Sequence, residues 1–598
     1  MTPTPLDSLR QIFGYSNFRQ YQSEIISTLI RGEDAFVLMP TGGGKSLCYQ
    51  IPALHRPGIG IVVSPLISLM KDQVDALREN GVRAAYYNSS LNAGEARDVL
   101  RRLHTNDLDL LYIAPERLMS HDFLERLNDV QIALFAIDEA HCVSQWGHDF
   151  RPEYMQLGRL RALFPKIPLI ALTATAESQT KSDIQERLNL QKAHSYIAGF
   201  DRPNIRYTVV DKRKPKEQLL AFLRGRHEQS GIVYCLSRKR VEQVAAHLSK
   251  SGFSSAAYHA GLPADERKRV QNDFLKDNLQ VVVATVAFGM GIDKPNVRFV
   301  VHYDLPKTIE SYYQETGRAG RDGLPSEALL LFGYGDIAVA RGLIESNRNQ
   351  DQKRIEIHKL NSMVAFTEAQ SCRRNVLLGY FGEHHQKPCG NCDICLDPPE
   401  LHDVTEEARK ALSCVYRVGQ RFGMMHVIDV LRGSQNERIR RLQHERLSTY
   451  GIGKDQPKEF WTSLMHNLVH HGFLFQDVAE YSILKLTETA RPLLRGEQQF
   501  TMAKPRARVS SAKKKSPKNT AALDYNEELF EKLRVLRKEL ADAGGVPPFV
   551  VFGDKSLIEM AAHLPSDDEE FLYIHGVGAN KLNKYGPAFL QAIADFKK

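Results

Sequence analysis

The sequence of 598 residues has no long apolar stretch and little tryptophan or cysteine. No apolar run approaches the ~18 residues that a membrane-spanning helix needs, which argues against a membrane protein. The first residues, MTPTPLDSLR, lack the apolar stretch of a secretion signal, so we expect a cytosolic protein. In that reducing compartment the eight cysteines should be reduced or bound to metal rather than paired in disulfides.

The excess of positive charge is confined to one segment. The formal net charge is +8, but seven basic residues and no acidic residue lie between Gln498 and Leu523, which leaves +1 for the rest. Overall basicity is therefore no argument for nucleic-acid binding, which has to be inferred from motifs. Residues 497–522, rich in Lys, Ser, Ala and Pro, are predicted to form a basic disordered linker.

Short apolar runs alternate with helix-like stretches in the first half of the chain. The first set is AFVLM, GIGIVV, LDLLYI, IALFAI and IPLIAL, and the second is GIVYCL, VVVAT, VRFVVHY and EALLLF. Such runs are typical of buried parallel strands with amphipathic crossovers. We therefore predict two α/β domains, residues 1–200 and 201–335. A helical cysteine-rich module (336–400), a mixed segment (401–496) and, after the linker, a helical domain (523–598) should follow.

A glycine-rich turn, PTGGGKS, follows the first predicted strand. Its glycines allow backbone amides to face a phosphate, and the following helix adds its positive end. Lys45 would reach the β- and γ-phosphates of a nucleotide, and the Ser46 hydroxyl would hold Mg²⁺. The usual pattern begins with glycine where this chain has Met39, and a plain turn between strand and helix is the alternative. The predicted loop consists of Thr41, Gly42, Gly43, Gly44, Lys45 and Ser46.

Two adjacent acids end the predicted strand IALFAI. Ligand sites of α/β proteins lie at such strand ends. Asp138 would hold Mg²⁺ through water, and Glu139 would polarise the water that attacks the γ-phosphate. The alternative is a solvated start of a helix.

Two arginines lie three positions apart in QETGRAGRDG, residues 314–323. On a helical turn, Arg318 and Arg321 would point the same way. Supplied across a cleft by the second domain, they would stabilise charge on the departing γ-phosphate. The alternative is a solvated basic face.

These motifs occur in order with SPLISLMKDQ (64–73), LTATA (172–176) and VATVAFGMGIDKP (283–295). The set resembles superfamily 2 helicases and, with FGYSNFRQYQSEII ahead of the glycine-rich turn, is similar to the RecQ family over essentially the whole chain. The resemblance implies an ATP-dependent DNA helicase that moves 3′ to 5′ and acts in recombination, repair and the SOS response. It also implies a bacterial, nucleoid-associated protein in the cytoplasm.

The resemblance further implies a fold of two tandem RecA-like parallel-sheet domains, a helical zinc module, a winged-helix domain and a small all-α HRDC-like bundle. Its cofactors would be ATP, Mg²⁺ and Zn²⁺. Its partners would be single-stranded and forked duplex DNA, with single-stranded-DNA-binding protein and other repair factors as further candidates and no membrane. RNA helicases and double-strand translocases have the same ATPase motifs and are two alternative functions. A DNA-binding scaffold with an inactive ATPase is a third alternative. The intact Lys45, Asp138, Glu139, Arg318 and Arg321 argue against that scaffold.

Two further sets of residues are implied by the resemblance. Gln22, with Arg19 and Tyr15, would recognise adenine, because an amide can pair with an acceptor and a donor on its edge; packing of the first helix is the alternative for Tyr15. The loop CVSQWGHDFRPEY (142–154) would stack DNA bases beside the catalytic acids. The alternative is that its aromatic residues plug the cleft between the domains. The residues expected to couple DNA to ATP are Trp146, His148, Phe150 and Arg151.

The cysteine cluster has the spacing C-x16-C-x2-C-x2-C, formed by Cys372, Cys389, Cys392 and Cys395. Four thiolates suit tetrahedral Zn²⁺ in a structural site, and an iron–sulfur cluster is the alternative.

Beyond the cluster, FWTSLMHNLVHHGF has helical spacing and GFLFQDVAEYSILKL predicts two strands around a short turn. Tyr481 near its tip would wedge at a duplex fork or pack locally. HGVGANKL (575–582) predicts a tight turn before a helix. Its amides, with Lys581 and Lys584, would bind a DNA phosphate, or the turn simply connects helices.

Overall fold

The computed structural model describes residues 3–65, 67–144, 151–175, 178–288, 292, 294–345, 350–383, 385, 387–477, 483–503 and 523–597. The chain forms two compact units, the first comprising Met1–Met363, Arg374–Cys392 and Ala507–Lys598 and the second Val364–Arg373 and Asp393–Arg506. Within the part that the structure describes, no helix is long and apolar enough to cross a membrane.

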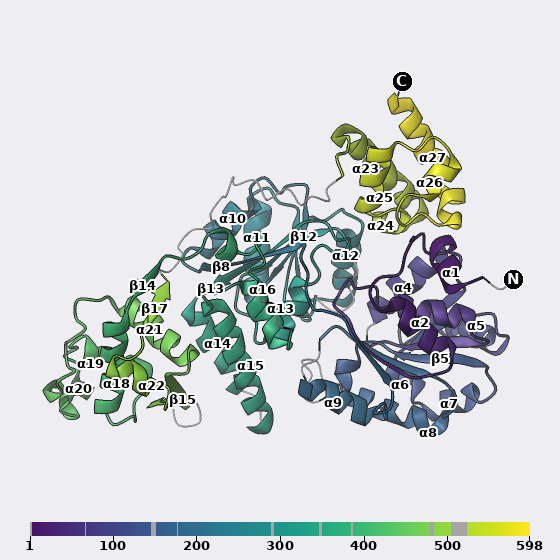
Figure 1. Cartoon of the computed structure of the whole chain (residues 1–598). Coiled ribbons are helices and arrows are strands. Elements are labelled where there is room, and N and C mark those ends of the chain that lie inside the picture. Colours follow the sequence, from purple (N-terminus) through teal and green to yellow (C-terminus); the bar gives the residue numbers. More distant parts are fainter. Residues whose placement is uncertain are drawn as a thin grey trace. The chain divides into compact units, whose positions relative to one another are not determined.

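The first sheet has seven parallel strands in the order β3-β4-β2-β5-β6-β1-β7. It lies in the purple-to-blue part of the chain, where β5 is labelled in Figure 1. Its strands are β1 (Ala35–Leu38), β2 (Ile59–Val63), β3 (Ala84–Tyr87), β4 (Leu110–Ile113), β5 (Ile132–Ile137), β6 (Leu169–Thr173) and β7 (His194–Ile197). Every residue of β1, β2, β4, β5 and β6 is buried. Burial on both faces explains why these five strands were recognisable as continuous apolar runs.

Helices flank this sheet, and two of them begin with a reciprocal cap. In α1, Asp7 N donates to the Thr4 hydroxyl while Thr4 N donates to the Asp7 carboxylate. The α-helices are α1 (Pro5–Gln11), α2 (Gln22–Ile30), α3 (Leu47–His55), α4 (Ile67–Glu79), α5 (Ala93–His104), α6 (Pro115–Leu118), α7 (His121–Leu127), α8 (Leu160–Leu163) and α9 (Ser178–Arg187). Two 3₁₀ helices, η1 (Ala140–Val143) and η2 (Pro152–Arg159), follow β5.

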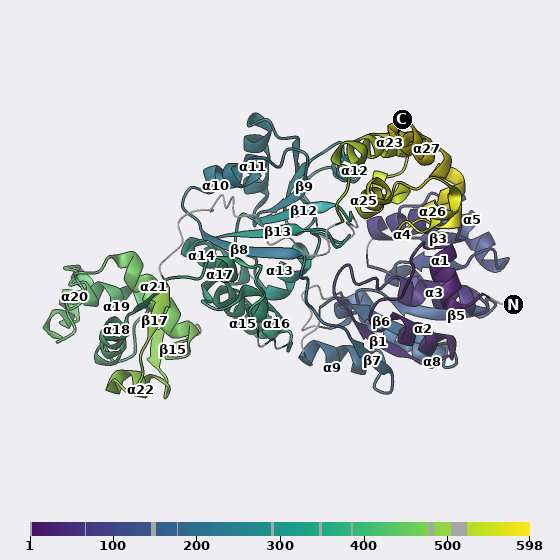
Figure 2. The same cartoon turned by 45° about the horizontal axis from the view of Figure 1, so that its top comes forward.

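The second sheet has six parallel strands in the order β10-β11-β9-β12-β13-β8. Strands β9, β12, β13 and β8 are labelled one after another in Figure 2. Alternate residues of β12 enter two separate cores: Phe299 and Val301 pack on one face and Val300 on the other. The strands are β8 (Ile205–Asp211), β9 (Ser230–Tyr234), β10 (Ser255–Tyr258), β11 (Val281–Ala284), β12 (Val297–His302) and β13 (Ser326–Phe332). The helices are α10 (Pro215–Leu223), α11 (Arg238–Lys250), α12 (Ala264–Leu275) and α13 (Ile309–Thr316).

The two sheets repeat one topology. Taken in chain order, β8 to β13 occupy the same places in the second sheet that β1 to β6 occupy in the first, and β7 is added beside β1. The predicted pair of parallel-sheet α/β domains is therefore confirmed. Their carboxyl strand ends carry the loops from which a ligand site is built.

Four helices follow the second sheet: α14 (Tyr334–Glu345), α15 (Gln350–Glu368), α16 (Arg373–Tyr380) and α17 (Asp393–Leu396). Next come α18 (Thr405–Arg417), α19 (Met424–Leu431), α20 (Glu437–Arg441), η3 (His444–Arg446), α21 (Lys458–His470) and α22 (Ala490–Arg495). Two antiparallel pairs join β14 (Leu401–Asp403) to β17 (Thr501–Ala503) and β15 (Leu474–Asp477) to β16 (Ile483–Leu486). The predicted helix and the two strands of the predicted hairpin are confirmed, whereas Tyr481 and the basic stretch 504–522 lie outside the described residues. The predicted start of the disordered linker at residue 497 is wrong, because Thr501–Ala503 form β17 against β14.

The C-terminal segment is a helical bundle with its own apolar core, built around Leu533, Phe552, Phe571 and Phe589. Its helices are α23 (Glu527–Gly544), α24 (Pro548–Val551), α25 (Asp554–His563), α26 (Asp568–Leu572) and α27 (Ala579–Lys597). The all-α character expected for this segment is confirmed.

Candidate nucleotide and metal sites

A cavity of about 570 Å³ in the first unit is lined by residues of both sheet domains. Its size falls within the range of small-molecule sites. All five residues predicted to be catalytic line it: Lys45, Asp138, Glu139, Arg318 and Arg321. Side chains that lie up to 276 positions apart in the sequence, Lys45 and Arg321, therefore face one space.

The glycine-rich loop has the backbone that its composition predicts. Gly42 and Gly44 adopt φ values of 80° and 82°, which favour glycine. A Cβ on Gly44 would lie only 2.5 Å from the side-chain nitrogen of Gln22, so a larger residue would displace that side chain as well as strain the backbone. Lys45 Nζ donates to Met39 O at 3.2 Å, and Ser46 directly precedes α3.

The two acids follow β5, as expected. Asp138 N still donates to Val63 O of the neighbouring strand, at 2.9 Å, and Glu139 then turns the chain with a left-handed φ of 49°. The Glu139 carboxylate lies 3.3 Å from His141 Nδ1, which in turn is 3.0 Å from the Thr173 hydroxyl at the end of β6. His141, whose role the sequence did not indicate, thus links the acids to the LTATA segment.

The expected helical turn at Arg318 and Arg321 is wrong. Helix α13 ends at Thr316, and both arginines lie in the turns after it. Gly320 has a left-handed φ of 57°, which ends helical geometry between them. Both side chains nevertheless line the cavity, so their expected convergence does not depend on a helix.

The residues expected at adenine line the same cavity. Gln22 Oε1 accepts from Arg19 N at 2.8 Å, and Gln22 Nε2 donates to Gly44 O at 3.0 Å. A carboxamide has two donors and two lone pairs, so one of each remains for a base. Tyr15 and Phe18 also pack against the core of the first domain, so the packing alternative is true as well.

The helical bundle contributes to this cavity too, which the sequence did not predict. Lys555 and His575 line it, and the His575 ring lies 5.1 Å from that of Tyr15. The turn predicted at HGVGANKL is present, with Gly576 at φ 78°. Gly576 N donates to Gly14 O at 2.8 Å and Lys584 pairs with Glu79 at 2.7 Å, so these groups already bind the first domain.

Of the residues expected to couple DNA to ATP, only Arg151 lies within the described residues; Trp146, His148 and Phe150 lie outside them. Arg151 Nη1 donates to Pro65 O at 2.9 Å and its backbone N donates to Cys142 O at 2.9 Å. Arg151 therefore joins the SPLISLMKDQ segment to the chain just after the acids.

Two links between the domains were missed. Gln314 Nε2 donates to the Thr175 hydroxyl at 3.0 Å, which connects QETGRAGRDG to LTATA. Both residues belong to motifs that the sequence displays, so their pairing could have been proposed. The buried Arg202 forms the other link and belongs to none of those motifs.

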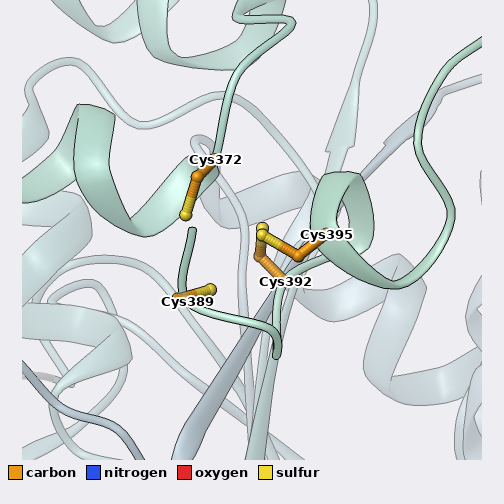
Figure 3. A group of neighbouring side chains, drawn as sticks. All are labelled: Cys372, Cys389, Cys392 and Cys395. Carbon is orange, nitrogen blue, oxygen red and sulfur yellow. The ribbon is translucent and has the colours of Figure 1, made fainter. Parts of the chain in front are cut away.

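The four predicted cysteine ligands converge (Figure 3). Their sulfur atoms all lie within 4.8 Å of one another, with Cys372 and Cys392 buried. Tetrahedral Zn–S bonds of about 2.3 Å would place the sulfurs about 3.8 Å apart, so a small contraction would suit zinc. The hydrogen bond with Cys392, followed by burial, raises the pKa of the Cys389 thiol well above its usual range. A dication would reverse that preference by stabilising thiolates.

Comparisons with known proteins agree along the entire chain. Five family models match: DEAD/DEAH box helicase (19–184), Helicase conserved C-terminal domain (212–323), RecQ zinc-binding (334–396), RQC domain (398–511) and HRDC domain (526–593). The chain is 51% identical to the ATP-dependent DNA helicase RecQ of Haemophilus influenzae, covering 100% of this chain and 96% of the relative. The chain belongs to the RecQ family. The relative of the same name in Bacillus subtilis is 44% identical, over 99% of this chain and 98% of its own length.

As a RecQ-family member with both helicase domains, the chain is an ATP-dependent DNA helicase. The expected order of two RecA-like domains, a zinc-binding domain, a winged-helix domain and an HRDC domain is confirmed. The DEAD/DEAH box domain supports the use of ATP and Mg²⁺, and the cysteine cluster supports Zn²⁺.

Proposed function

We propose that this helicase moves 3′ to 5′ along single-stranded DNA and separates duplexes during recombination and repair in the bacterial cytoplasm. The observation that carries the proposal is the single cavity lined by Lys45, Asp138, Glu139, Arg318 and Arg321. A phosphate-binding lysine, two strand-end acids and two arginines from a second domain are the groups that nucleotide hydrolysis requires. Direction and biological setting rest on the RecQ family and not on the cavity.

The predicted site residues that line the cavity have distinct proposed roles. Lys45 and the amides of residues 41–46 hold the β- and γ-phosphates, Ser46 and Asp138 hold Mg²⁺, and Glu139 polarises the attacking water. Arg318 and Arg321 stabilise the charge that develops on the γ-phosphate. Tyr15, Arg19 and Gln22, which line the cavity beside the loop, bind adenine.

The cysteine module and the loop after the two acids are proposed to support DNA binding. We assign one structural Zn²⁺ to the four cysteines Cys372, Cys389, Cys392 and Cys395. We also propose that bound DNA changes the position of the two acids through contacts with Trp146, His148, Phe150 and Arg151. The partners proposed are single-stranded and forked duplex DNA, with single-stranded-DNA-binding protein as a protein partner. The domain limits proposed are 1–200, 201–335, 336–400, 401–503, 504–522 and 523–598, because β17 pairs with β14 and so belongs with the winged-helix domain.

A steady-state assay tests the proposal. ATP hydrolysis should rise with single-stranded DNA and not with RNA, and a duplex with a 3′ overhang should be unwound while one with a 5′ overhang should not. Glu139→Gln should bind ATP with unchanged affinity and lose turnover, because only water activation is removed. Stimulation by RNA, preference for a 5′ overhang, or full turnover in Glu139→Gln would each contradict one part of the proposal.

A further inference from the structure

A short segment connects the two sheets. Strand β7 ends at Ile197, at the edge of the first sheet, and β8 begins at Ile205, at the edge of the second. Residues 198–204 between them are held at several points: Ala198 N donates to Leu38 O at 2.9 Å, and Phe200 O accepts from the Tyr313 hydroxyl at 2.8 Å. The segment is thus a tightly bonded connection rather than a loose linker.

Arg202, in the middle of this segment, is 8% exposed and donates to four backbone carbonyls. Nη1 donates to Thr41 O at 2.6 Å and to Gly317 O at 3.0 Å. Nη2 donates to Ala319 O at 3.0 Å and to Gly320 O at 2.9 Å. Thr41 belongs to the phosphate-binding loop, whereas the other three carbonyls belong to the loop that carries Arg318 and Arg321. One guanidinium therefore joins the two loops that must meet across the nucleotide.

The two loops are also close to each other. A Cβ on Gly42 would lie 3.6 Å from both Arg321 O and Arg202 Nη1, and a Cβ on Gly317 would lie 3.4 Å from the Thr41 Cβ. At this separation, a small shift of the arginine-bearing loop changes where its side chains enter the cavity. Misplacement by about 1 Å can reduce a reaction rate on the order of 100-fold.

The Arg202 segment is itself braced. Arg374 Nη2 donates to Ile205 O at 2.8 Å and to Arg202 O at 3.3 Å, and Asn204 Nδ2 donates to Gly320 O at 2.8 Å. Burial lowers the pKa of Arg202, and the nearby Arg321 acts in the same direction.

We propose that Arg202 is a positioning residue that sets the arginine-bearing loop against the phosphate-binding loop, so that Arg318 and Arg321 reach the γ-phosphate. This inference rests on the roles proposed for Arg318 and Arg321. Arg202 is not among the residues that line the cavity, so it acts through the loop and not on the nucleotide. Its loss should affect turnover and leave ATP binding nearly intact.

The test compares Arg202→Gln, Arg202→Lys, Arg318→Ala and the Arg202→Gln/Arg318→Ala double variant in the full-length zinc-loaded protein at saturating single-stranded DNA. Arg202→Gln should lower kcat by about 30-fold while the Kd of a fluorescent, non-hydrolysable ATP analogue changes by less than about threefold. Arg202→Lys, which keeps the charge and up to three donors, should recover part of the loss. The fold loss that Arg202→Gln causes should be clearly smaller in the Arg318→Ala background than in the wild type, because the Arg318 part of the contribution is already absent and only Arg321 remains to be misplaced.

Arg56→Gln is the matched control. Arg56 also donates to three backbone carbonyls, those of Ala133, Leu29 and Ile30, but it does not line the cavity. This variant should lower Tm and leave kcat per folded molecule unchanged. If Arg202→Gln fails to fold, the effect of Arg202→Lys on kcat is compared instead between the wild type and the Arg318→Ala background.

Unchanged kcat in Arg202→Gln, or losses that multiply in the double variant, would overturn the inference. If Arg318→Ala itself hydrolyses ATP at the normal rate, the proposed arginine role fails instead. The two failures are therefore distinguishable in one series.

Discussion

The two sheet domains share a strand order but use the carboxyl edge of the sheet differently. In the first, the loop after β1 and the acids after β5 line a cavity. In the second, Lys212 directly follows β8, and its Nζ lies 2.6 Å from Asp304, just beyond β12, and 2.8 Å from Asp336. The Asp304 side chain is fully buried. The same topology thus places a lysine and strand-end acids together twice, once around a cavity and once as an internal ion pair.

This difference shows what topology does and does not decide. Parallel strands of this order bring the loops after the first and fifth strands to one edge, whatever their sequences. Three glycines in the first loop keep its backbone amides available, whereas the Lys-Arg-Lys loop of the second places a side chain directly on the acid. Loop composition therefore decides whether the shared edge binds a ligand or stabilises the fold.

The largest expected effect comes from exchanging the two lysines for methionine. Lys45→Met should reduce ATP hydrolysis by at least about 100-fold, because a charge at the phosphates is lost, and leave Tm nearly unchanged. Lys212→Met should do the reverse. Asp336 would lose its cationic partner, whereas Asp304 would keep Arg240, so the cost should be on the order of 3 kcal/mol of unfolding free energy, while hydrolysis per folded molecule stays normal. Calorimetry measures Tm and an ATPase assay measures hydrolysis in both variants. If the two variants change Tm and hydrolysis by equal amounts, the two lysines do not have the different roles inferred here.

The next effect concerns the sheet edges. In the first sheet β7 pairs with the outer side of β1, whereas the corresponding strand of the second sheet, β8, is an edge strand. Asn391 of the cysteine module donates to Pro203 O at 3.2 Å, two residues before β8 begins. Cys392→Ser should reduce zinc from about one per chain to near zero and speed hydrogen exchange in β8 more than in β1. Mass spectrometry of both strands provides the measurement.

Cys414→Ala, a buried cysteine outside the cluster, should keep its zinc and serve as the control for that experiment. Zinc loss with unchanged protection of β8 would show that the module does not brace this edge.

A third effect concerns the segment after the strand-end acids. In the second domain Asp304 leads almost directly to α13, whereas the first domain has the longer CVSQWGHDFRPEY loop. Trp146→Ala and Phe150→Ala should keep basal hydrolysis but lose most of the stimulation by single-stranded DNA. Stacking of one base contributes about 1–3 kcal/mol, so stimulation must be compared at saturating DNA. Normal stimulation in both variants would assign the signal to another segment.

The smallest effect is a pH dependence of the second domain. Burial raises the pKa of Asp336 above its ordinary value, although Lys212 opposes this. A carboxyl group with a raised folded pKa binds more protons when folded, so its contribution to stability grows as pH falls through the folded pKa towards the ordinary value of the unfolded chain. Asp336→Asn should weaken this dependence and keep a hydrogen bond to Lys212. The stability of the second domain is measured by urea unfolding at pH 7 and pH 5, with hydrogen exchange in β13 as the probe. If the pH dependence of stability is the same in Asp336→Asn and the wild type, Asp336 does not cause it.

Much of the fold could be predicted because burial on both faces leaves a simple signal. β1, β2, β4, β5 and β6 are continuous apolar runs. β3 and β10 were missed because AAYY and SAAY contain small and polar residues, and β7 because its residues are mostly exposed. Strand pairing compensates for weak local preference at these places.

The site was predictable to the extent that its residues form motifs beside strand ends. Lys45, Asp138 and Glu139 needed only the strands before them. Arg202 gave no such signal, because its partners are backbone carbonyls, which every sequence possesses. The Lys212–Asp304 pair joins residues 92 positions apart, and only the repeated topology brings them together.

The left-handed backbone at Glu139 has a consequence for how this enzyme can change. A side chain in that conformation costs about 1–2 kcal/mol relative to one in the right-handed region, and glycine would avoid most of that cost. Selection for heat resistance alone would therefore favour losing the carboxylate to which we assign activation of the attacking water. The turn thus gives up stability at the residue to which we assign water activation, and laboratory evolution that screens only for folded protein should drift towards glycine at this position.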